Sequence, residues 1–461
     1  MIQRLLAAEW LRFKANPANH WILGIFCLAL LLNAAWAGWN AREFRLQQQR
    51  EMAEWQQQLE GERTKLSAAD PALLTAEKNA RTAFDFARHK APPAQLPARE
   101  GLALSASAFK LFDTATRVTI TNRHADNRKS ETLSNPQLDE IGDIDFATLT
   151  ALLLPILCIC LGYGLLQDDR ESGVWRLTAM THPRTWQVLA AALVIRWGAI
   201  VACLALSSAL AFAVDNGSSL PAYLNWVSAG AGFAAIWIGL AGLYCLLPIS
   251  AGASASAQLA TWILSGFVVP AALAAHDGPP PPSRMTSIAT MRAIQLDVDE
   301  QGQTLLTQWY AQNGHTPVPI RAHVWPVSFM PRYEAESLRT RTLFRQFDEV
   351  RVARDARLAS WMWLSPGMSL LNVADRLAGI DSARYLGYAL AVDAYEDRWR
   401  AYFTPRIMFH EGLTHADLAR LPTFEFADAR TPATRPALRL WLVALVLLLV
   451  FLLFRRRANT P

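Results

Sequence analysis

Six long apolar stretches dominate this sequence of 461 residues and restrict the folds that it can adopt. Each has about 20 residues or more, the length that an α-helix needs to cross the hydrocarbon core of a bilayer. Because lipid offers the backbone no hydrogen-bond partners, such stretches must cross as helices. The sequence therefore predicts an α-helical polytopic membrane protein with six transmembrane helices. They are residues 20–38, 146–166, 190–214, 222–247, 255–275 and 436–454.

Composition indicates that the membrane helices are only part of the protein. Hydrophobic residues make up 52% of the chain, which is high for a soluble domain, yet 18% are charged. That charge is more than a bundle of membrane helices alone would carry. Most of it falls in two long polar segments, residues 39–145 and 276–435. We expect these two insertions to form one large, mainly helical domain with some β-structure.

Lysine and arginine near the ends of the apolar stretches predict which side each end faces. Cytoplasmic loops carry an excess of these residues. With six spans counted, the three basic groups fall on one side, so both termini and the 455–461 tail are expected in the cytoplasm. The two insertions then lie together on the opposite, extracytoplasmic side. The basic groups are Arg4, Arg12 and Lys14; Arg170, Arg176 and Arg184; and Arg455, Arg456 and Arg457.

The N-terminal residues 1–19 have apolar side chains at helical spacing and reach Pro17 before the first span. This pattern is typical of an amphipathic helix that lies on the membrane surface. The alternative is a secretory signal peptide cleaved after Ala37, because Ala35 and Ala37 satisfy the small-residue rule. The long amphipathic lead favours the interfacial helix.

The insertions show coarse secondary-structure patterns. In the first, no helix breaker occurs from Ala41 to Glu60, so span one is expected to continue as a helix out of the membrane. A turn within 61–71 should then lead to a second helix that runs back through Lys90 and into a linker, 91–98. The remaining predictions are a β-prone piece at 117–120, a polyproline stretch at 279–282, and helices over 285–312, 332–358 and 382–403.

The loop between spans two and three, residues 167–189, carries the most informative polar sequence. It opens with the cluster Asp168, Asp169, Arg170 and Glu171, then continues through Gly173 to Pro183 and Arg184. A helix here with Trp175, Leu177 and Met180 exposed beside those charges would suit docking into a groove of another protein. An ordinary solvated loop is the alternative.

Arg196 is a charge within the apolar run 190–214. An ionisable residue inside a membrane is a candidate functional group. The simpler interpretation, which we favour, is that the core of span three begins at Trp197 and that Arg196 extends to the cytoplasmic interface.

Several function classes lack their sequence signatures. The chain has no phosphate-binding GxxxxGK[ST] loop and no dinucleotide fingerprint, so any nucleotide must bind to another chain. It has no polybasic tract of the kind that binds nucleic acid. Cys158 and Cys160 have the wrong spacing for one helix face, so we expect no metal there. His410 and His415 are spaced i, i+5, and a metal site that uses them stays open only as an alternative.

The stretch 167–186 resembles a segment of type 2 ABC exporter permeases, in which an acidic Glu-x-Gly loop after the second span leads to a Pro-Arg turn. The matching residues are Glu171, Gly173, Pro183 and Arg184, whereas Asp168 and Asp169 stand where a Glu is usual. In that family the segment is a coupling helix that contacts a separate ATP-binding subunit.

Two further stretches resemble the branch of that family with large extracytoplasmic insertions, related to multi-copper enzyme maturation permeases. One is residues 135–146, which enter span two. The other is residues 364–400, with Ser365-Pro366, the turn 377–381 and Arg398. The domain of that branch has no assigned function.

The resemblance implies a permease subunit in a bacterial inner membrane. Its partners would be an ATPase subunit that holds ATP and Mg, a second permease chain, the lipid bilayer and a periplasmic protein. No cofactor or metal is expected in this chain. Residues 167–185 would transmit ATP-driven motion, and spans two and five would line the path.

Three functions stay open at this point. The first is transport by an ABC permease subunit. The second is mechanotransmission, in which ATP-driven motion acts on a periplasmic partner and nothing crosses the membrane. The third is a membrane enzyme, metal-dependent or not, with its site in 276–435, for which the sequence offers no constellation of catalytic residues.

Overall fold

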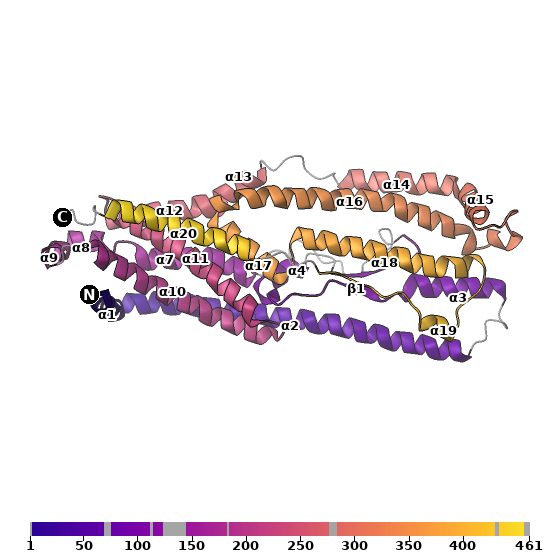
Figure 1. Ribbon diagram of the computed structural model, residues 1–461, viewed down its shortest axis with the longest axis horizontal. Helices are drawn as coiled ribbons and strands as arrows, with labels where there is room; N and C mark the ends of the chain where they lie inside the picture. The colour runs from indigo at the N-terminus through magenta and orange to yellow at the C-terminus, as the bar shows by residue number, and fades with distance from the viewer. Residues whose placement is uncertain are drawn as a thin grey trace.

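A computed structural model describes residues 2–68, 75–110, 114–122, 144–181, 184–275, 284–428 and 433–455. The molecule is elongated, and its helices lie mostly along its length (Figure 1). The stretches 135–143 and 279–282, as well as Pro183, Arg456 and Arg457, lie outside the described residues.

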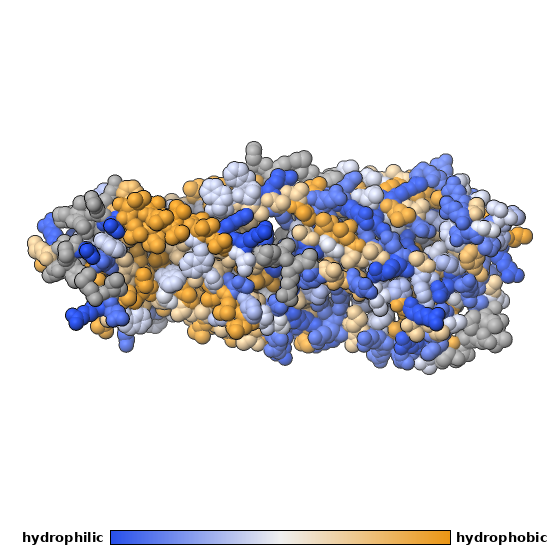
Figure 2. Space-filling view, in the orientation of Figure 1, coloured by the Kyte–Doolittle hydropathy of each residue, from blue (hydrophilic) through white to orange (hydrophobic). Residues whose placement is uncertain are grey.

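Six helices in the described residues are long and apolar enough to cross a membrane, as expected of a multi-pass membrane protein. Figure 2 shows apolar side chains concentrated over one half of the molecule, which we call the membrane half. The helices are α2 (Pro17–Ala68), α7 (Phe146–Gly162) with its continuation to Glu171, α10 (Trp186–Asp215), α11 (Leu220–Cys245), the composite of α12 (Ala251–Ile263), the π-helix η4 (Leu264–Val268) and α13 (Val269–Ala275), and α20 (Thr434–Phe454).

The fifth candidate span differs from the others in how little of its surface is buried by the rest of the chain. Only 6% of the most apolar part of Ala251–Ala275 is buried, compared with 67% for Leu220–Cys245. A π-helix within a span widens the local turn. This span therefore lies at the edge of the bundle, whereas α11 lies within it.

The first span continues far beyond bilayer thickness. Pro17 occupies the first turn, where its missing N–H costs nothing, and Asn16 Oδ1 accepts a hydrogen bond from Ala18 N at 3.0 Å. The helix then runs without a break to Ala68. The predicted continuation of span one is confirmed, and α3 (Ala76–His89) is the expected returning helix.

The polar half, which we call the distal domain, comprises the described residues of 45–122 and 284–428. Its remaining elements include one antiparallel ribbon of β1 (Pro93–Gln95) and β2 (Ala115–Arg117), with Ala94 opposite Thr116. The helices are α4 (Ala106–Lys110), α14 (Arg284–Glu300), α15 (Gly302–Gln312), α16 (Met330–Trp361), α17 (Pro366–Ala378), α18 (Ser382–Met408) and α19 (His415–Leu418), with short 3-10 turns η2 (Leu102–Leu104), η5 (Ile320–His323), η6 (Val327–Phe329) and η7 (Met362–Leu364).

The β-prone stretch 117–120 was placed wrongly by the sequence pattern. The strand ends at Arg117, and Val118 and Ile120 are buried outside any strand. Apolar packing rather than strand pairing accounts for their hydrophobicity. The single helix predicted over 285–312 is divided between α14 and α15 at Gln301.

Helix α18 joins the two insertions into one packed unit. The Trp399 indole N–H donates to the carbonyl of Ala87 at 2.9 Å, and the Tyr388 hydroxyl donates to the carbonyl of Ala94 at 2.6 Å. Trp399 also packs on Phe403, with ring centroids 4.7 Å apart. These side chains are fully buried, so the core of the distal domain is built from residues of both insertions.

The stretch 364–381 forms a pair of capped helices. Ser365 accepts a hydrogen bond from Met368 N and starts α17, and Pro366 occupies its first turn. Gly379 ends α17 with a φ of +84°, a conformation that side-chain-bearing residues rarely adopt. Asp381 then caps α18 by accepting from Arg384 N.

A buried ion pair joins the distal domain to the membrane half. Asp215, completely buried at the end of α10, accepts from Arg45 Nε at 2.8 Å and from Arg45 Nη2 at 3.1 Å. The same guanidinium donates to the carbonyls of Ala98 at 3.2 Å and Arg99 at 2.6 Å. One side chain of α2 thus holds the end of span three and the linker after β1.

We predict that Trp399→Ala destabilises the protein by about 3–5 kcal/mol, because it leaves a large cavity and removes a buried hydrogen bond. Trp361→Ala is the matched control, since Trp361 is 52% exposed and its loss should change stability by about 0.5 kcal/mol or less. Thermal unfolding of the detergent-solubilised protein, followed by circular dichroism, measures both. Equal decreases of the melting temperature in the two variants would show that α18 does not join the insertions.

Candidate docking site

The loop between spans two and three lies at the end of the molecule opposite the distal domain, near both chain termini (Figure 1). It forms two short helices, α8 (Gln167–Glu171) and α9 (Val174–Thr181). The sequence predicted one helix over this region, and that prediction was wrong. The chain breaks at Gly173, whose φ of +76° ends α8.

Gly164 sets the start of α8 in a similar way. Its φ is +72°, and a Cβ at this position would lie 2.9 Å from the Asp168 carboxylate. A larger residue would therefore be strained and would collide with that side chain. The two glycines turn the chain sharply at the end of span two.

An ion pair fixes α8 to the N-terminal helix α1 (Ile2–Ala15). Arg12 Nη1 donates to Asp169 Oδ2 at 2.9 Å, and Arg12 Nη2 donates to Oδ1 at 2.5 Å. Asp169 is buried, whereas about half of the Arg12 side chain is exposed. This two-bond geometry is the strong form of a guanidinium–carboxylate pair, and it raises the pKa of Arg12.

Glu9 lies behind this pair. Its Oε1 atom is 3.9 Å from Arg12 Nη1, and its other carboxylate oxygen has no hydrogen-bond donor within the described residues. Burial raises the pKa of Glu9, against the opposing charges of Arg12 and Arg196. The underside of α1 therefore carries a carboxyl group that is poorly stabilised in its charged form.

Arg196 does not extend to solvent, so the favoured sequence interpretation was wrong on this point. Its guanidinium is buried and donates to the carbonyls of Leu161 at 2.7 Å and Ala192 at 3.0 Å. It also lies over the ring of Phe13, 5.7 Å from the centroid. The residue thus ties α7 and α10 to α1.

The other predicted site residues divide between exposed and buried positions. Asp168, Glu171 and Arg184 are exposed, Arg170 is partly buried, and Pro183 lies outside the described residues. Trp175 was expected to be exposed, but only 2% of it is accessible, because its indole packs in the core. It anchors α9 and is not available to a partner.

Helix α9 presents an apolar face to solvent. Val174, Leu177 and Met180 are 47%, 66% and 83% exposed, and their i, i+3, i+6 spacing places them on one side of the helix. We call these three residues the docking face. Large apolar side chains grouped in this way beside Glu171 and Arg184 are typical of a surface that binds another protein.

The sequence did not indicate Glu9 and Arg12 as part of this site. Their i, i+3 spacing within an amphipathic helix was a signal for a charged patch. Nothing in the sequence, however, specifies that the ion-pair partner of Arg12 is Asp169, which lies 157 positions further along the chain.

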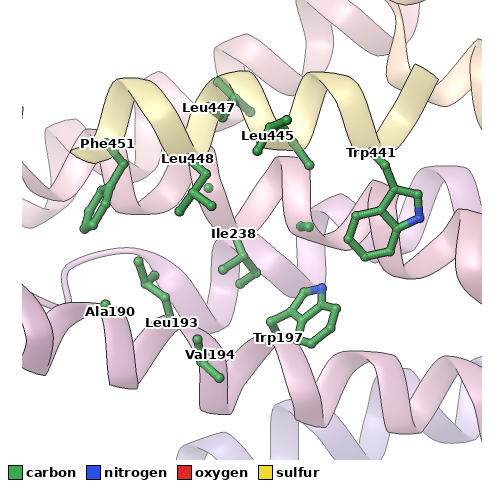
Figure 3. A pocket seen from close by; sticks show the side chains of 13 residues that line it. Ala190, Leu193, Val194, Trp197, Ile238, Trp441, Leu445, Leu447, Leu448 and Phe451 are labelled. Atoms are coloured by element: carbon green, nitrogen blue, oxygen red, sulfur yellow. The ribbon is translucent and has the colours of Figure 1, made fainter. Parts of the chain in front are cut away.

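Among the described residues, no group of three or more His, Cys, Asp or Glu side chains is placed to hold a metal ion. The membrane half does contain cavities. One of about 400 Å³ lies between α10, α11 and α20, with Trp197 and Trp441 toward one end and Phe451 toward the other (Figure 3). Its lining is apolar, because the indole N–H groups donate to Ala231 O and Ser228 Oγ.

A protein-family model described as a domain of unknown function, DUF3526, matches residues 284–427. This region contains α14 to α19, so the similarity concerns the distal domain and does not include the docking face. Comparisons with curated proteins and with solved structures found no match.

We predict that Asp169→Asn loosens α8 and α9 from α1, because it leaves Arg12 without its carboxylate. Arg12 is half exposed and solvent screens the pair, so we expect the local opening free energy to fall by about 1–2 kcal/mol. Hydrogen exchange across 167–181 measures this opening. Asp168→Asn is the matched control, since Asp168 is an exposed neighbour; equally fast exchange in both variants would refute a specific role for Asp169.

The Glu9 site predicts a pH dependence. A carboxyl group whose pKa is raised by folding stabilises the protein below its ordinary value of 4.5 and loses that contribution as pH rises through the higher folded value. Glu9→Gln should therefore raise the melting temperature at pH 7, with the gain disappearing toward pH 4. The exposed Glu54→Gln is the control. A gain that is independent of pH would contradict this assignment.

Proposed function

We propose that this chain is the membrane permease subunit of an ABC transporter. In this proposal a separate ATPase subunit binds ATP and Mg and docks on α8 and α9. ATP-driven motion then passes through these helices to the membrane half and promotes export of a substrate. The observation that carries the proposal is the docking face, an exposed apolar surface on the short helix α9. Buried Trp175 anchors this helix, and the Arg12–Asp169 pair fixes the adjoining α8 at the end of the bundle.

The proposal assigns sides to the structure. The docking face and both termini would lie in the cytoplasm of a bacterium, and the distal domain would lie in the periplasm. Support comes from the basic residues near the docking face, Arg170, Arg176 and Arg184, which follow the positive-inside pattern.

A second copy of the chain, or a related permease, would complete the transporter. The poor coverage of α12, η4 and α13 within one chain supports this. An apolar span with so little of its surface buried can pack against another chain in the membrane through its small residues.

Mechanotransmission is the second candidate, and one observation favours it. Helix α2 runs unbroken for 52 residues from the interfacial helix into the distal domain. A continuous helix can transmit displacement along its length, so ATP-driven motion could act on a periplasmic protein bound to the distal domain without any substrate crossing.

We predict that the double variant Leu177→Ala, Met180→Ala co-purifies with at least about tenfold less ATPase subunit than the unmodified protein, because two exposed apolar contacts are removed. The control is Ile320→Ala with Leu338→Ala, two exposed apolar residues of the distal domain. Retention of the ATPase subunit by the first variant, with correct membrane assembly, would refute docking at α9.

Charge changes at the same site test coupling separately from docking. Replacing Glu171 or Arg184 should abolish transport-coupled ATPase activity while the membrane subunit still assembles. Unchanged stimulated ATPase activity in both variants would count against the coupling role of 167–185.

A further inference from the structure

A second cavity of the membrane half lies on the side of α20 away from the cavity of Figure 3. Its volume is about 570 Å³, within the range of small-molecule sites, and it lies between α11, the α12–η4 segment, η7 and α20. We call it the α20 cavity. Residues that define it include Trp237, Thr261, Ser265, Trp363, Arg439 and Val443.

The α20 cavity differs from the cavity of Figure 3 in its hydrogen bonding. Trp237 lines it, only 4% of this residue is accessible, and its indole N–H has no acceptor within the described part of the chain. A buried donor without an acceptor costs free energy, which a bound oxygen would recover. In the other cavity, by contrast, both indole N–H groups already have acceptors.

Arg439 gives the cavity a positive charge. It lines the cavity and donates a hydrogen bond to the carbonyl of Ala359. Within the described ranges, no carboxylate forms an ion pair with it. A guanidinium carries five N–H donors, so most of them are available to an anionic oxygen. Trp237 and Arg439 thus both offer donors, and the charge of Arg439 favours an anion.

The position of the cavity relates it to the membrane surface. Trp361 and Trp363, each 52% exposed, lie where α16 and η7 meet the membrane half. Trp and Arg at the end of a span are typical of the level of lipid headgroups. From Arg439 the lining continues along α20 through Leu442, Val443, Val446 and Leu447, all of them apolar.

We propose that the α20 cavity binds an anionic lipid. Its charged headgroup pairs with Arg439, an ester carbonyl accepts from the Trp237 indole N–H, and an acyl chain lies along the apolar residues of α20. This site is independent of the proposed ATPase partner, since residues of one chain form all of it.

The test measures binding of phosphatidylglycerol and phosphatidylcholine to the full-length protein in detergent by native mass spectrometry. We expect phosphatidylglycerol to bind in preference to phosphatidylcholine. Arg439→Gln should weaken phosphatidylglycerol binding by about tenfold, because it removes the charge-assisted hydrogen bonds. Val443→Phe should abolish it by filling the cavity with a larger side chain.

Two control variants lie on the same helix. Arg435→Gln removes an exposed charge one turn from Arg439 that does not line the cavity, and Leu445→Phe fills the cavity of Figure 3 instead. Both should bind phosphatidylglycerol as the unmodified protein does. Circular dichroism and gel filtration confirm that all four variants are folded.

Other outcomes would overturn the proposal. Equal binding of the two lipids would remove the anionic preference, and equal loss in the control variants would place the lipid elsewhere. Inorganic phosphate that competes as well as the lipid would indicate a free-anion site. A crosslink from the Val446→Cys variant to a second copy would show that protein fills the cavity.

Discussion

The arrangement of the molecule depends on the buried contact between Arg45 and Asp215. A carboxylate at the end of a membrane helix is costly unless a cation and hydrogen bonds compensate it. Arg45 supplies both, and its remaining N–H groups bind the carbonyls of Ala98 and Arg99. Since Arg45 belongs to the long helix α2, this side chain links the distal domain to the membrane half, together with the packing of α17 on α7, α11 and α20.

The opposite end of the bundle is organised by the second ion pair, Arg12–Asp169, with buried Arg196 beneath it. Helices α2 and α10 pack along each other between the two pairs. A displacement of α8 would therefore reach α1 through the Arg12–Asp169 pair, and α1 packs on α10 and α2, which lead to Arg45. This connection is the physical basis on which we propose that ATP-driven motion at the docking face is transmitted to the distal domain.

Periodicity and capping chemistry made much of the fold predictable. Six spans, the continuation of α2 and the start of α18 follow from apolar runs and from breakers such as Pro17 and Gly379. The ends were less predictable, because α16 is longer than expected at both ends and α18 continues past Pro405 to Met408. Long-range pairing was not predictable. The contact of Asp169 with Arg12, the burial of Trp175 and the carbonyl contacts of Arg196 depend on how distant elements pack, which local sequence does not encode. The same limit applies to the site, where the charged loop was recognisable but its division at Gly173 was not.

The most direct test of the account is purification of the protein at its native expression level after gentle solubilisation, with mass spectrometry of the proteins that accompany it. The account predicts an ATP-binding subunit in stoichiometric amount. A second permease or a periplasmic protein in the same complex would distinguish transport from mechanotransmission. If no ATPase subunit accompanies the chain, α8 and α9 are an ordinary loop, and the proposed coupling is wrong.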